Sequence, residues 1–161
     1  MTPSQRGRAN RQKGVRFERA IATKLRKAGF IVRRNLEYDG FHTGADLLVA
    51  VCRNIYDGNL AFDEEPETEL CWLPVAIQCK ASQNKADLVK GLEQCQTSSF
   101  VSEWFGGNTL FVCLHSYRRV GKKPELRIIA RRGACTYYSR TWDWLIQQLT
   151  VMKSVLTRVD N

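Results

Sequence analysis

The chain has 161 residues, of which 43% are hydrophobic and 25% are charged, and its formal net charge is +9 at pH 7. This composition excludes a wholly disordered chain and favours one folded domain with a sizeable core. No apolar run approaches the roughly 18 residues that a membrane span needs, and the N-terminus lacks the apolar segment of a signal peptide. We therefore expect a cytoplasmic protein with no membrane partner.

The positive charge is concentrated at the start of the chain. Residues 1–34 contain eleven Lys and Arg but a single acidic residue, Glu18, whereas the remainder contains fourteen basic and fifteen acidic residues. This asymmetry favours a polyanionic partner, most simply nucleic acid, although a tail that only aids solubility has the same composition. Residues 1–12 show no apolar period, so we interpret them as a flexible basic arm that precedes a single domain over residues 13–161.

A helix is predicted over residues 14–28, because apolar residues recur there at helical spacing. Gly29 follows the last turn as a C-cap, and residues 30–36 read as a first strand. Residues 38–44 are rich in turn formers. The recurring apolar residues of the helix are Phe17, Ile21, Leu25 and Ala28.

A second strand is predicted over residues 45–52 and a third from Pro74, where a missing amide donor is tolerated. Residues 53–72 between them include a cluster of acidic side chains, and we interpret this segment as a solvated hairpin tip or an insertion. The acidic residues are Asp63, Glu64, Glu65, Glu67 and Glu69.

The second half of the chain predicts two more helices and two more strands. The helices are residues 87–105 and 141–156, and the strands are residues 109–115 and 126–130, with a basic turn at 118–124. Three strands in succession, then a helix and two strands, indicate an α/β (α+β) fold with a central mixed five-stranded sheet flanked by helices.

Six cysteines are present, but none forms a C-x-x-C pair and the chain has only two histidines, so zinc-finger spacing is absent. Several cysteines lie within apolar runs, which favours free buried thiols.

The segment from Val75 to Lys80 carries an amide and an amine within an apolar strand. Because side chains alternate along a strand, Gln78 and Lys80 project from one face. An ammonium on a core strand is costly unless a charge answers it, and Asp46 supplies a carboxylate at the start of another apolar run. Taken singly, Asp46 can be a turn cap, and Gln78 and Lys80 can be the exposed face of an edge strand.

Oxygen ligands of this kind suit a hard divalent cation such as Mg²⁺, which often takes only one or two protein carboxylates. Asp46, the side-chain carbonyl of Gln78 and the backbone carbonyl of Cys79 are the candidate ligands. Lys80 can orient or deprotonate an attacking water, or stabilise charge on a phosphate. Glu18 lies at the edge of the apolar helix stripe and is a further candidate, with an ion pair to Arg19 or Lys24 as the alternative.

Three segments in this order resemble the PD-(D/E)xK nuclease superfamily and, within it, Holliday junction resolvases of the archaeal and phage type. Residues 13–19 resemble the family's N-terminal helix with its essential glutamate, residues 44–48 its metal-binding aspartate segment, and residues 77–80 its E-x-K segment. The resemblance implies a restriction-endonuclease-like core, with Glu18, Asp46, Gln78 and Lys80 as catalytic residues. Gln78 replaces the family's glutamate, which removes one negative charge from the metal site.

The resemblance further implies a homodimer that cuts four-way DNA junctions with Mg²⁺, for which Mn²⁺ substitutes. The dimer interface would involve the last helix or the region of Phe100, Trp104 and Phe105, although core packing explains most of these aromatic residues equally well. Two other functions stay open: another endonuclease of the superfamily, of restriction or repair type, and a non-catalytic DNA-binding relative with a decayed site.

Basic and polar residues near these motifs are the candidate DNA contacts, because phosphate contacts position a duplex without reading its sequence. For the turn at 118–124, an ordinary solvated turn is the alternative. The candidates are Arg6, Arg8, Arg11, Lys13, Arg16, Arg33, Arg34, Ser82, Arg118, Arg119, Lys122 and Lys123.

Overall fold

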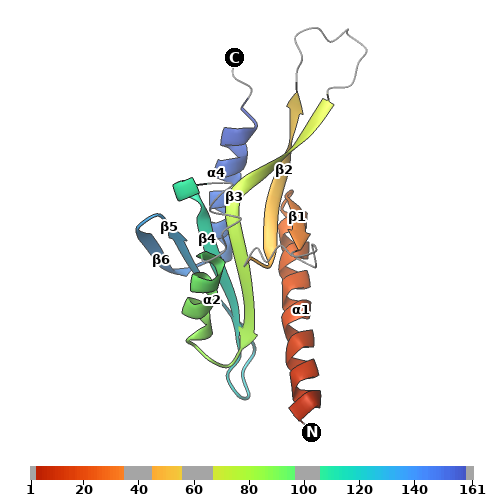
Figure 1. Cartoon of the computed structure of the whole chain (residues 1–161), viewed down its shortest axis with the longest axis vertical. Helices are drawn as coiled ribbons and strands as arrows, with labels where there is room; N and C mark the ends of the chain where they lie inside the picture. Colours follow the sequence, from red (N-terminus) through yellow and green to blue (C-terminus); the bar gives the residue numbers. More distant parts are fainter. Residues whose placement is uncertain (1–2, 35–44, 56–66, 97–105, 159–161) are drawn as a thin grey trace.

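The computed structural model describes residues 3–34, 45–55, 67–96 and 106–158 (Figure 1). The longer elements in chain order are α1 (Pro3–Lys27), β1 (Ile31–Arg34), β2 (Leu47–Ile55), β3 (Glu67–Ser82), α2 (Asp87–Gln96), β4 (Leu110–Tyr117), β5 (Glu125–Arg132), β6 (Cys135–Arg140) and α4 (Trp142–Leu156). A short 3₁₀ turn, η1 (Gly106–Asn108), precedes β4.

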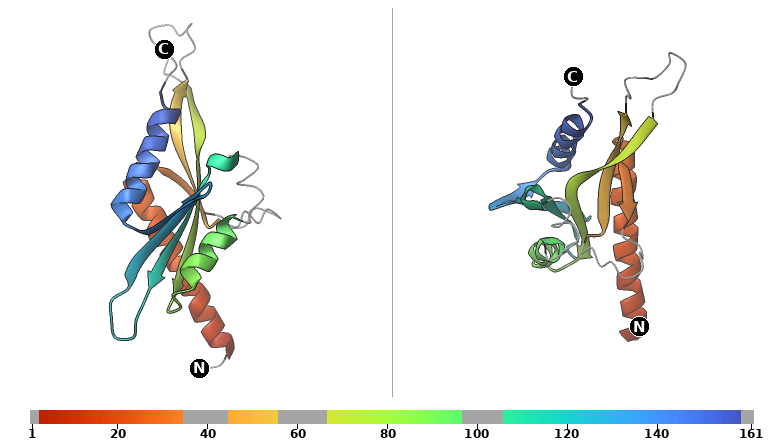
Figure 2. Two further views of the ribbon diagram at one scale, coloured as in Figure 1. Left: turned by 90° about the vertical axis from the view of Figure 1, so that its left-hand side faces the viewer. Right: turned by 45° about the horizontal axis from the view of Figure 1, so that its top comes forward.

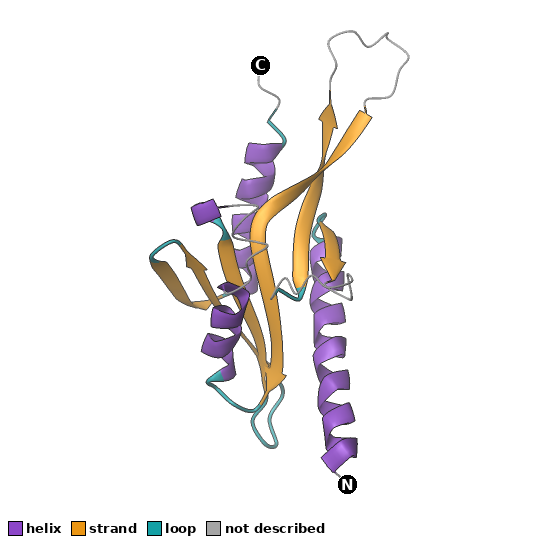
Figure 3. Ribbon diagram, viewed as in Figure 1, coloured by secondary structure: helices purple, strands orange, loops and turns teal. Residues whose placement is uncertain are grey.

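The strands form one mixed sheet in the order β1-β2-β3-β4-β5-β6 (Figure 3). Only β3 and β4 are parallel, and α2 lies in the connection between them, whereas the other neighbouring strands are antiparallel. This arrangement follows from connection length, since antiparallel strands can be joined by tight turns but parallel strands need a crossover. The predicted α+β class with a mixed, helix-flanked sheet is confirmed, with one strand more than expected.

Helices cover both faces of the sheet, with α1 and α4 on one side and α2 on the other (Figure 2). On the first side, Val75, Ile77 and Cys79 of β3 share the main core with residues of both helices. The buried helix residues in that core are Ile21, Ala22, Leu25, Leu145, Leu149 and Met152. The alternate residues of β3, including Gln78 and Lys80, therefore face the α2 side.

The helix α1 begins at Pro3, so the prediction of a flexible arm at residues 1–12 is wrong for residues 3–12. Pro is well tolerated at the first helical position, where its missing amide hydrogen has no partner to lose. Extending a helix that its buried end has already nucleated adds one hydrogen bond for each residue ordered. The absence of an apolar stripe over these residues indicated exposure, not disorder. The predicted C-cap is confirmed, since Gly29 has φ 85° and Phe30 N–H donates to the Leu25 carbonyl.

The strand β3 begins at Glu67, seven residues before the predicted start at Pro74. Residues 67–71 pair with β2, so this part of the predicted acidic insertion is strand, and Arg53 forms an ion pair with Glu69 across it. The β2–β3 register shifts between the pairs Leu48–Ala76 and Ala50–Trp72. Pro74 lies at this irregularity, where an absent backbone donor costs little.

The sixth strand, β6, was missed because the segment carries few buried side chains and ends in an exposed edge. Only Gly133 and Ala134 separate it from β5, and Gly133 has φ 55°, a value that the tight hairpin turn requires.

Several predictions fall partly outside the described residues. The helix predicted over 87–105 is α2 up to Gln96, and its remainder, with Phe100, Trp104 and Phe105, lies outside them. The turn-rich loop at 38–44 and residues 56–66 of the insertion lie outside them as well. Within the part of the chain that the structure describes, no helix is long and apolar enough to cross a membrane.

The contact between α2 and the sheet depends on a glycine. A Cβ added at Gly91 would lie 2.5 Å from the Cys113 Sγ and 3.1 Å from the Lys80 Cγ. We expect Gly91→Ala to lower the free energy of unfolding by about 1–3 kcal/mol, because buried atoms must shift to admit the methyl group. Urea denaturation measures this change.

The matched control is Gly14→Ala in α1, where no heavy atom lies within 4 Å of the added Cβ. This variant should be more stable by about 0.5–1 kcal/mol, because alanine is the better helix former. Equal effects at the two positions would contradict the close α2 contact.

Candidate metal and nucleic-acid site

The candidate site lies where the pairing between β2 and β3 ends. The last β2–β3 pair is Leu47–Ile77, so residues 78–82 of β3 pair only with β4. Asp46 ends the ladder on this side: its amide donates to the Ile77 carbonyl at 2.8 Å, and its Oδ2 accepts from the Cys79 amide at 2.7 Å. One carboxylate oxygen therefore replaces the missing strand partner. Asp46 thus caps the edge of β3, whereas the turn of the alternative interpretation lies outside the described residues.

The Asp46 carboxyl carries an unusual pKa. Burial raises the pKa from 3.8 to about 6, and the nearby charge of Glu18 adds to this effect, although the Cys79 amide, Lys80 and the Gln78 side chain lower it. A half-buried carboxylate that lies near a second acid is stabilised by a nearby cation.

The Gln78 side chain is buried, with 8% of its surface exposed, and its Oε1 has no hydrogen-bond partner. Burial contradicts the alternative of an exposed strand face for this residue. A buried carbonyl oxygen without a hydrogen-bond donor lowers the stability of the folded state by about 1–3 kcal/mol. A ligand that binds the Gln78 Oε1 would remove this cost.

Lys80 is half-buried, two residues further along the same face of β3. Its aliphatic stem lies under Gly91 of α2, which leaves room for the side chain because it has no Cβ. The lysine charge lowers the pKa of Asp46, so the two groups interact electrostatically. The apolar stem is thus held by α2 while the ammonium lies near the carboxylate, a division that long amphipathic side chains commonly make.

Glu18 forms an ion pair with Arg34, whose Nη2 lies 2.9 Å from the Glu18 Oε2. Both side chains are largely buried, at 19% and 10% exposure. The alternative of an ion pair with Arg19 or Lys24 is wrong, because the partner comes from β1 and not from the helix itself. The DNA contact predicted for Arg34 stays a prediction, and in the structure Arg34 holds the Glu18 carboxylate that α1 presents towards Asp46.

These groups fit a hard divalent cation. The Cys79 amide donates to Asp46 Oδ2 and the Gln78 side chain is hydrogen-bonded to the same carboxyl, whereas Gln78 Oε1 has no partner and remains for a ligand. The Cys79 carbonyl faces the same open edge as its amide, because the two groups of one residue point to the same side of a strand. Among the described residues no group of three or more His, Cys, Asp or Glu side chains is arranged to hold a metal.

All six cysteines are free, as predicted, and Cys79, Cys95 and Cys113 are buried. Burial raises the pKa of Cys113 to about 12 and raises that of Cys79 further above its ordinary value. The Cys79 thiol packs in the main core. It is therefore not a metal ligand, and only the backbone of this residue belongs to the site.

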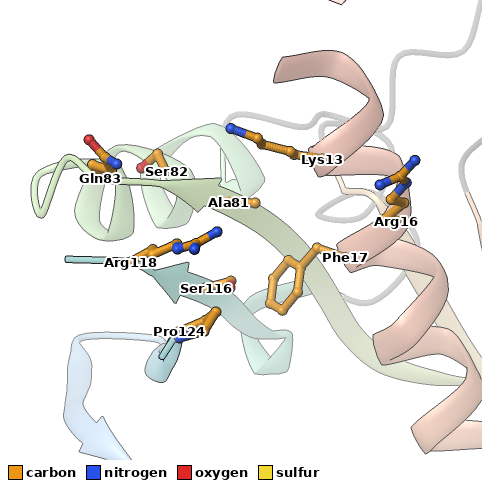
Figure 4. Close-up of a pocket in the computed structure, with 9 residues that line it drawn as sticks. All are labelled: Lys13, Arg16, Phe17, Ala81, Ser82, Gln83, Ser116, Arg118 and Pro124. Carbon is orange, nitrogen blue, oxygen red and sulfur yellow. The ribbon is translucent and has the colours of Figure 1, made fainter. Parts of the chain in front are cut away.

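A pocket of about 350 Å³ lies next to this site, between α1 and the carboxyl ends of β3 and β4 (Figure 4). Three cationic side chains line it, Lys13 and Arg16 from α1 and Arg118 after β4, and no acidic residue does. The Arg118 amide donates to the Ser82 carbonyl at 3.3 Å, which ties the two strand ends together. The remaining lining residues are Phe17, Ala81, Ser82, Gln83, Ser116 and Pro124.

His115 was not singled out from the sequence, and the structure places it near the candidate site. It is fully buried in β4 beside Lys80 in register, and its Nε2 lies 3.0 Å from the Ser82 Oγ, while Nδ1 has no partner. Burial lowers its pKa, which favours the neutral imidazole. The signal was available, since a histidine within an apolar strand is the same kind of exception as Gln78 and Lys80.

The other predicted DNA contacts lie on α1, on β1 and in the turn between β4 and β5. Arg8 and Arg11 are exposed on α1, and Arg6 lies on the same helix. Arg33 stacks on the Trp72 ring at 5.4 Å. In the turn between β4 and β5, Arg119 lies over Tyr117, and Lys122 and Lys123 are exposed.

Comparison with known proteins adds no name to this geometry. The chain matches no protein-family model, and a search of the curated proteins found no match either.

The raised pKa of Asp46 predicts how stability depends on pH without metal. The folded state keeps its proton up to about pH 6 and the unfolded state only to about 3.8, so stability falls as pH rises through this window and is lowest above it. We expect Asp46→Asn, which cannot ionise, to gain about 2–3 kcal/mol relative to wild type between pH 3.5 and 8. Urea denaturation in EDTA across this range measures the gain.

A suitable control is Glu93→Gln, which removes a negative charge from an exposed position on α2. Its stability relative to wild type should stay within about 0.5 kcal/mol across the same range. A pH-independent difference for Asp46→Asn would contradict the buried, desolvated carboxyl.

Proposed function

We propose that the protein is a metal-dependent, structure-selective endodeoxyribonuclease and that its substrate is a four-way DNA junction. The observation that carries the proposal is the group at the open edge of β3. A buried carboxylate with raised pKa, an unpartnered amide oxygen and a lysine lie together there, beside the most basic helix of the chain. The resemblance of these segments to the PD-(D/E)xK superfamily, and to Holliday junction resolvases in particular, supports the same assignment.

Asp46 and Gln78 would hold Mg²⁺ or Mn²⁺ with the Cys79 carbonyl, and Glu18 would add a second carboxylate nearby. The bound ion would supply Lewis-acid activation of water and neutralisation of charge on the phosphate. The protein's part is to exclude solvent around Asp46 and Gln78 and to hold both at one edge of β3. The bond from the Cys79 amide fixes the orientation of the Asp46 carboxylate before any substrate arrives.

Lys80 is the group best situated to contact the attacking water or the scissile phosphate. Its stem is held against α2, so the ammonium has little freedom and its charge lies near Asp46. Arg34 holds the Glu18 side chain in place before a ligand binds. The Glu18 side chain therefore loses little conformational entropy when the ligand binds.

A homodimer belongs to the same proposal, because a junction has to be cut in two strands and the described chain contains one such site. Val151 and Val155 leave an exposed apolar strip on α4, whereas Leu145, Leu149 and Met152 are taken up by the core. The aromatic residues Trp142 and Trp144 are partly buried against that core as well, which favours core packing for them. A cytoplasmic location is part of the proposal.

A second candidate is a DNA-binding protein without cleavage activity. The observation that favours it is Gln78 itself, since a neutral amide in place of a carboxylate lowers the negative charge available to a metal. The two candidates differ in one property: a binding protein retains salt-sensitive DNA binding but shows no cleavage with any divalent cation. Cutting of linear duplex and junction alike would instead favour a restriction- or repair-type endonuclease.

The proposal predicts magnesium-dependent cleavage of a labelled four-way junction in preference to linear duplex. We expect Asp46→Ala to abolish cleavage and Lys80→Met to lower its rate by about 10²–10⁴-fold, because a proton-transfer or charge-stabilising group is lost. Single-turnover rates on denaturing gels measure both effects, and circular dichroism verifies folding.

The control Glu93→Gln should cleave as wild type does. Absence of cleavage by wild type with either Mg²⁺ or Mn²⁺ would overturn the assignment, and so would full activity of Asp46→Ala.

Gln78 provides a separate test of the metal site. Gln78→Glu adds a carboxylate beside Asp46, so the Mn²⁺ concentration that gives half-maximal thermal stabilisation should fall by roughly tenfold, since affinity follows ligand charge. Gln78→Leu fills the same space without an oxygen and should raise that concentration. Equal titration midpoints for the three proteins would exclude Gln78 as a ligand.

A further inference from the structure

The pocket beside the candidate site has the chemistry of an anion site. Lys13 extends from α1 towards the end of β3, and Arg118 extends into the same space from the end of β4 (Figure 4). The two residues are 105 positions apart in the chain, so only the tertiary fold brings their charges together.

None of the three cationic side chains that line the pocket, Lys13, Arg16 and Arg118, forms an ion pair within the described part of the chain. The ion pairs there join Arg34 to Glu18, Arg53 to Glu69 and Arg127 to Glu125, and none involves a residue that lines the pocket. Two like charges across one cavity repel each other, and an anion between them is attracted to both, which outweighs that repulsion.

The pocket walls indicate what the anion is attached to. Phe17, Ala81 and Pro124 form apolar surface, and Ser116 and Ser82 add small polar groups. A volume of about 350 Å³ exceeds the need of a single bare anion. A phosphate with its attached sugar combines a charged head with a less polar body, which matches a cavity lined by both cationic side chains and an aromatic ring.

The position along β3 links the pocket to the candidate site. Ser82 follows Lys80 by two residues and Gln78 by four, which at about 3.3 Å per residue places its Cα roughly 13 Å along the strand from Gln78. The pocket lies on the α1 side of the sheet, whereas Gln78 and Lys80 face the α2 side. A nucleic-acid strand, which advances about 3.4 Å per nucleotide along its axis, therefore has to pass the open edge of β3 at Asp46 to contact both.

We infer that Lys13 and Arg118 jointly bind one backbone phosphate of the nucleic acid held at the candidate site, with the attached sugar against Phe17. This inference rests on the proposed DNA partner, but not on cleavage. The phosphate sets the register of the strand relative to Asp46 and Gln78, and it joins α1 to the β4–β5 turn through the substrate.

The test is the salt dependence of junction binding in EDTA, where no cleavage occurs. Each phosphate neutralised contributes about 0.9 to the slope of log K against log salt on B-form DNA. If the two cations share one phosphate, Lys13→Ala and Arg118→Ala each lower the slope by less than 0.9, because the partner still neutralises the group. The double variant then lowers the slope by about 0.9, and the affinity losses of the two single variants do not add.

The control is the double variant Lys27→Ala/Arg158→Ala, which removes one lysine from α1 and one arginine from elsewhere, both exposed and outside the pocket. Its slope should equal that of wild type. A loss of about 1.8 in the Lys13→Ala/Arg118→Ala variant, with additive affinity losses, would show two separate phosphates and overturn the inference. A slope equal to the control would overturn it as well.

The outcomes separate this inference from the proposed function. Non-additive binding without any metal-dependent cleavage would sustain the shared phosphate and refute the nuclease. Metal-dependent cleavage together with additive affinity losses would sustain the nuclease and refute the shared phosphate. A wild-type protein that binds no DNA would refute both.

Discussion

The hydrogen bond from the Cys79 amide to the Asp46 carboxylate is the constraint on which the site depends. It stands where β2 and β3 stop pairing, and it satisfies a backbone donor that would otherwise face an open edge. The bond brings a carboxylate into a buried position that raises its pKa, and it leaves the neighbouring carbonyl of Cys79 facing the same side. The polar site thus begins at the residue where the β2–β3 pairing ends.

The second feature is the division of β3 between two faces. Val75, Ile77 and Cys79 belong to the core with α1 and α4, whereas Gln78 and Lys80 lie on the face that α2 covers. The polar pair is therefore supported by the same strand that the apolar triplet anchors, and core packing holds both sets in place. Gly91 completes this arrangement, because a larger residue would displace Lys80 and Cys113.

The distribution of charge has a structural consequence as well. α1 carries most of the excess positive charge as a continuous helix and presents it beside the open edge of β3. Glu18, its only acid, is neutralised by Arg34, so the outward charges of the helix have no internal counterpart among the described ion pairs. A helix holds these charges in one orientation, which a flexible arm cannot do.

The sequence by itself determined the α+β class and most of the strands. It also drew attention to Asp46, Gln78 and Lys80, because polar groups at or within apolar runs are visible without a structure. It did not predict β6 or the early start of β3, since these segments carry few buried side chains and owe their pairing to neighbouring strands. Nor did it predict that residues 3–12 are helical, because these residues lack an apolar period. Their helix extends from the packed second half of α1. Only the tertiary structure decided that Arg34 pairs with Glu18, that Gln78 Oε1 has no donor, and that Lys13 and Arg118 line one pocket, because each depends on residues that lie far apart in the chain and are brought together by the fold.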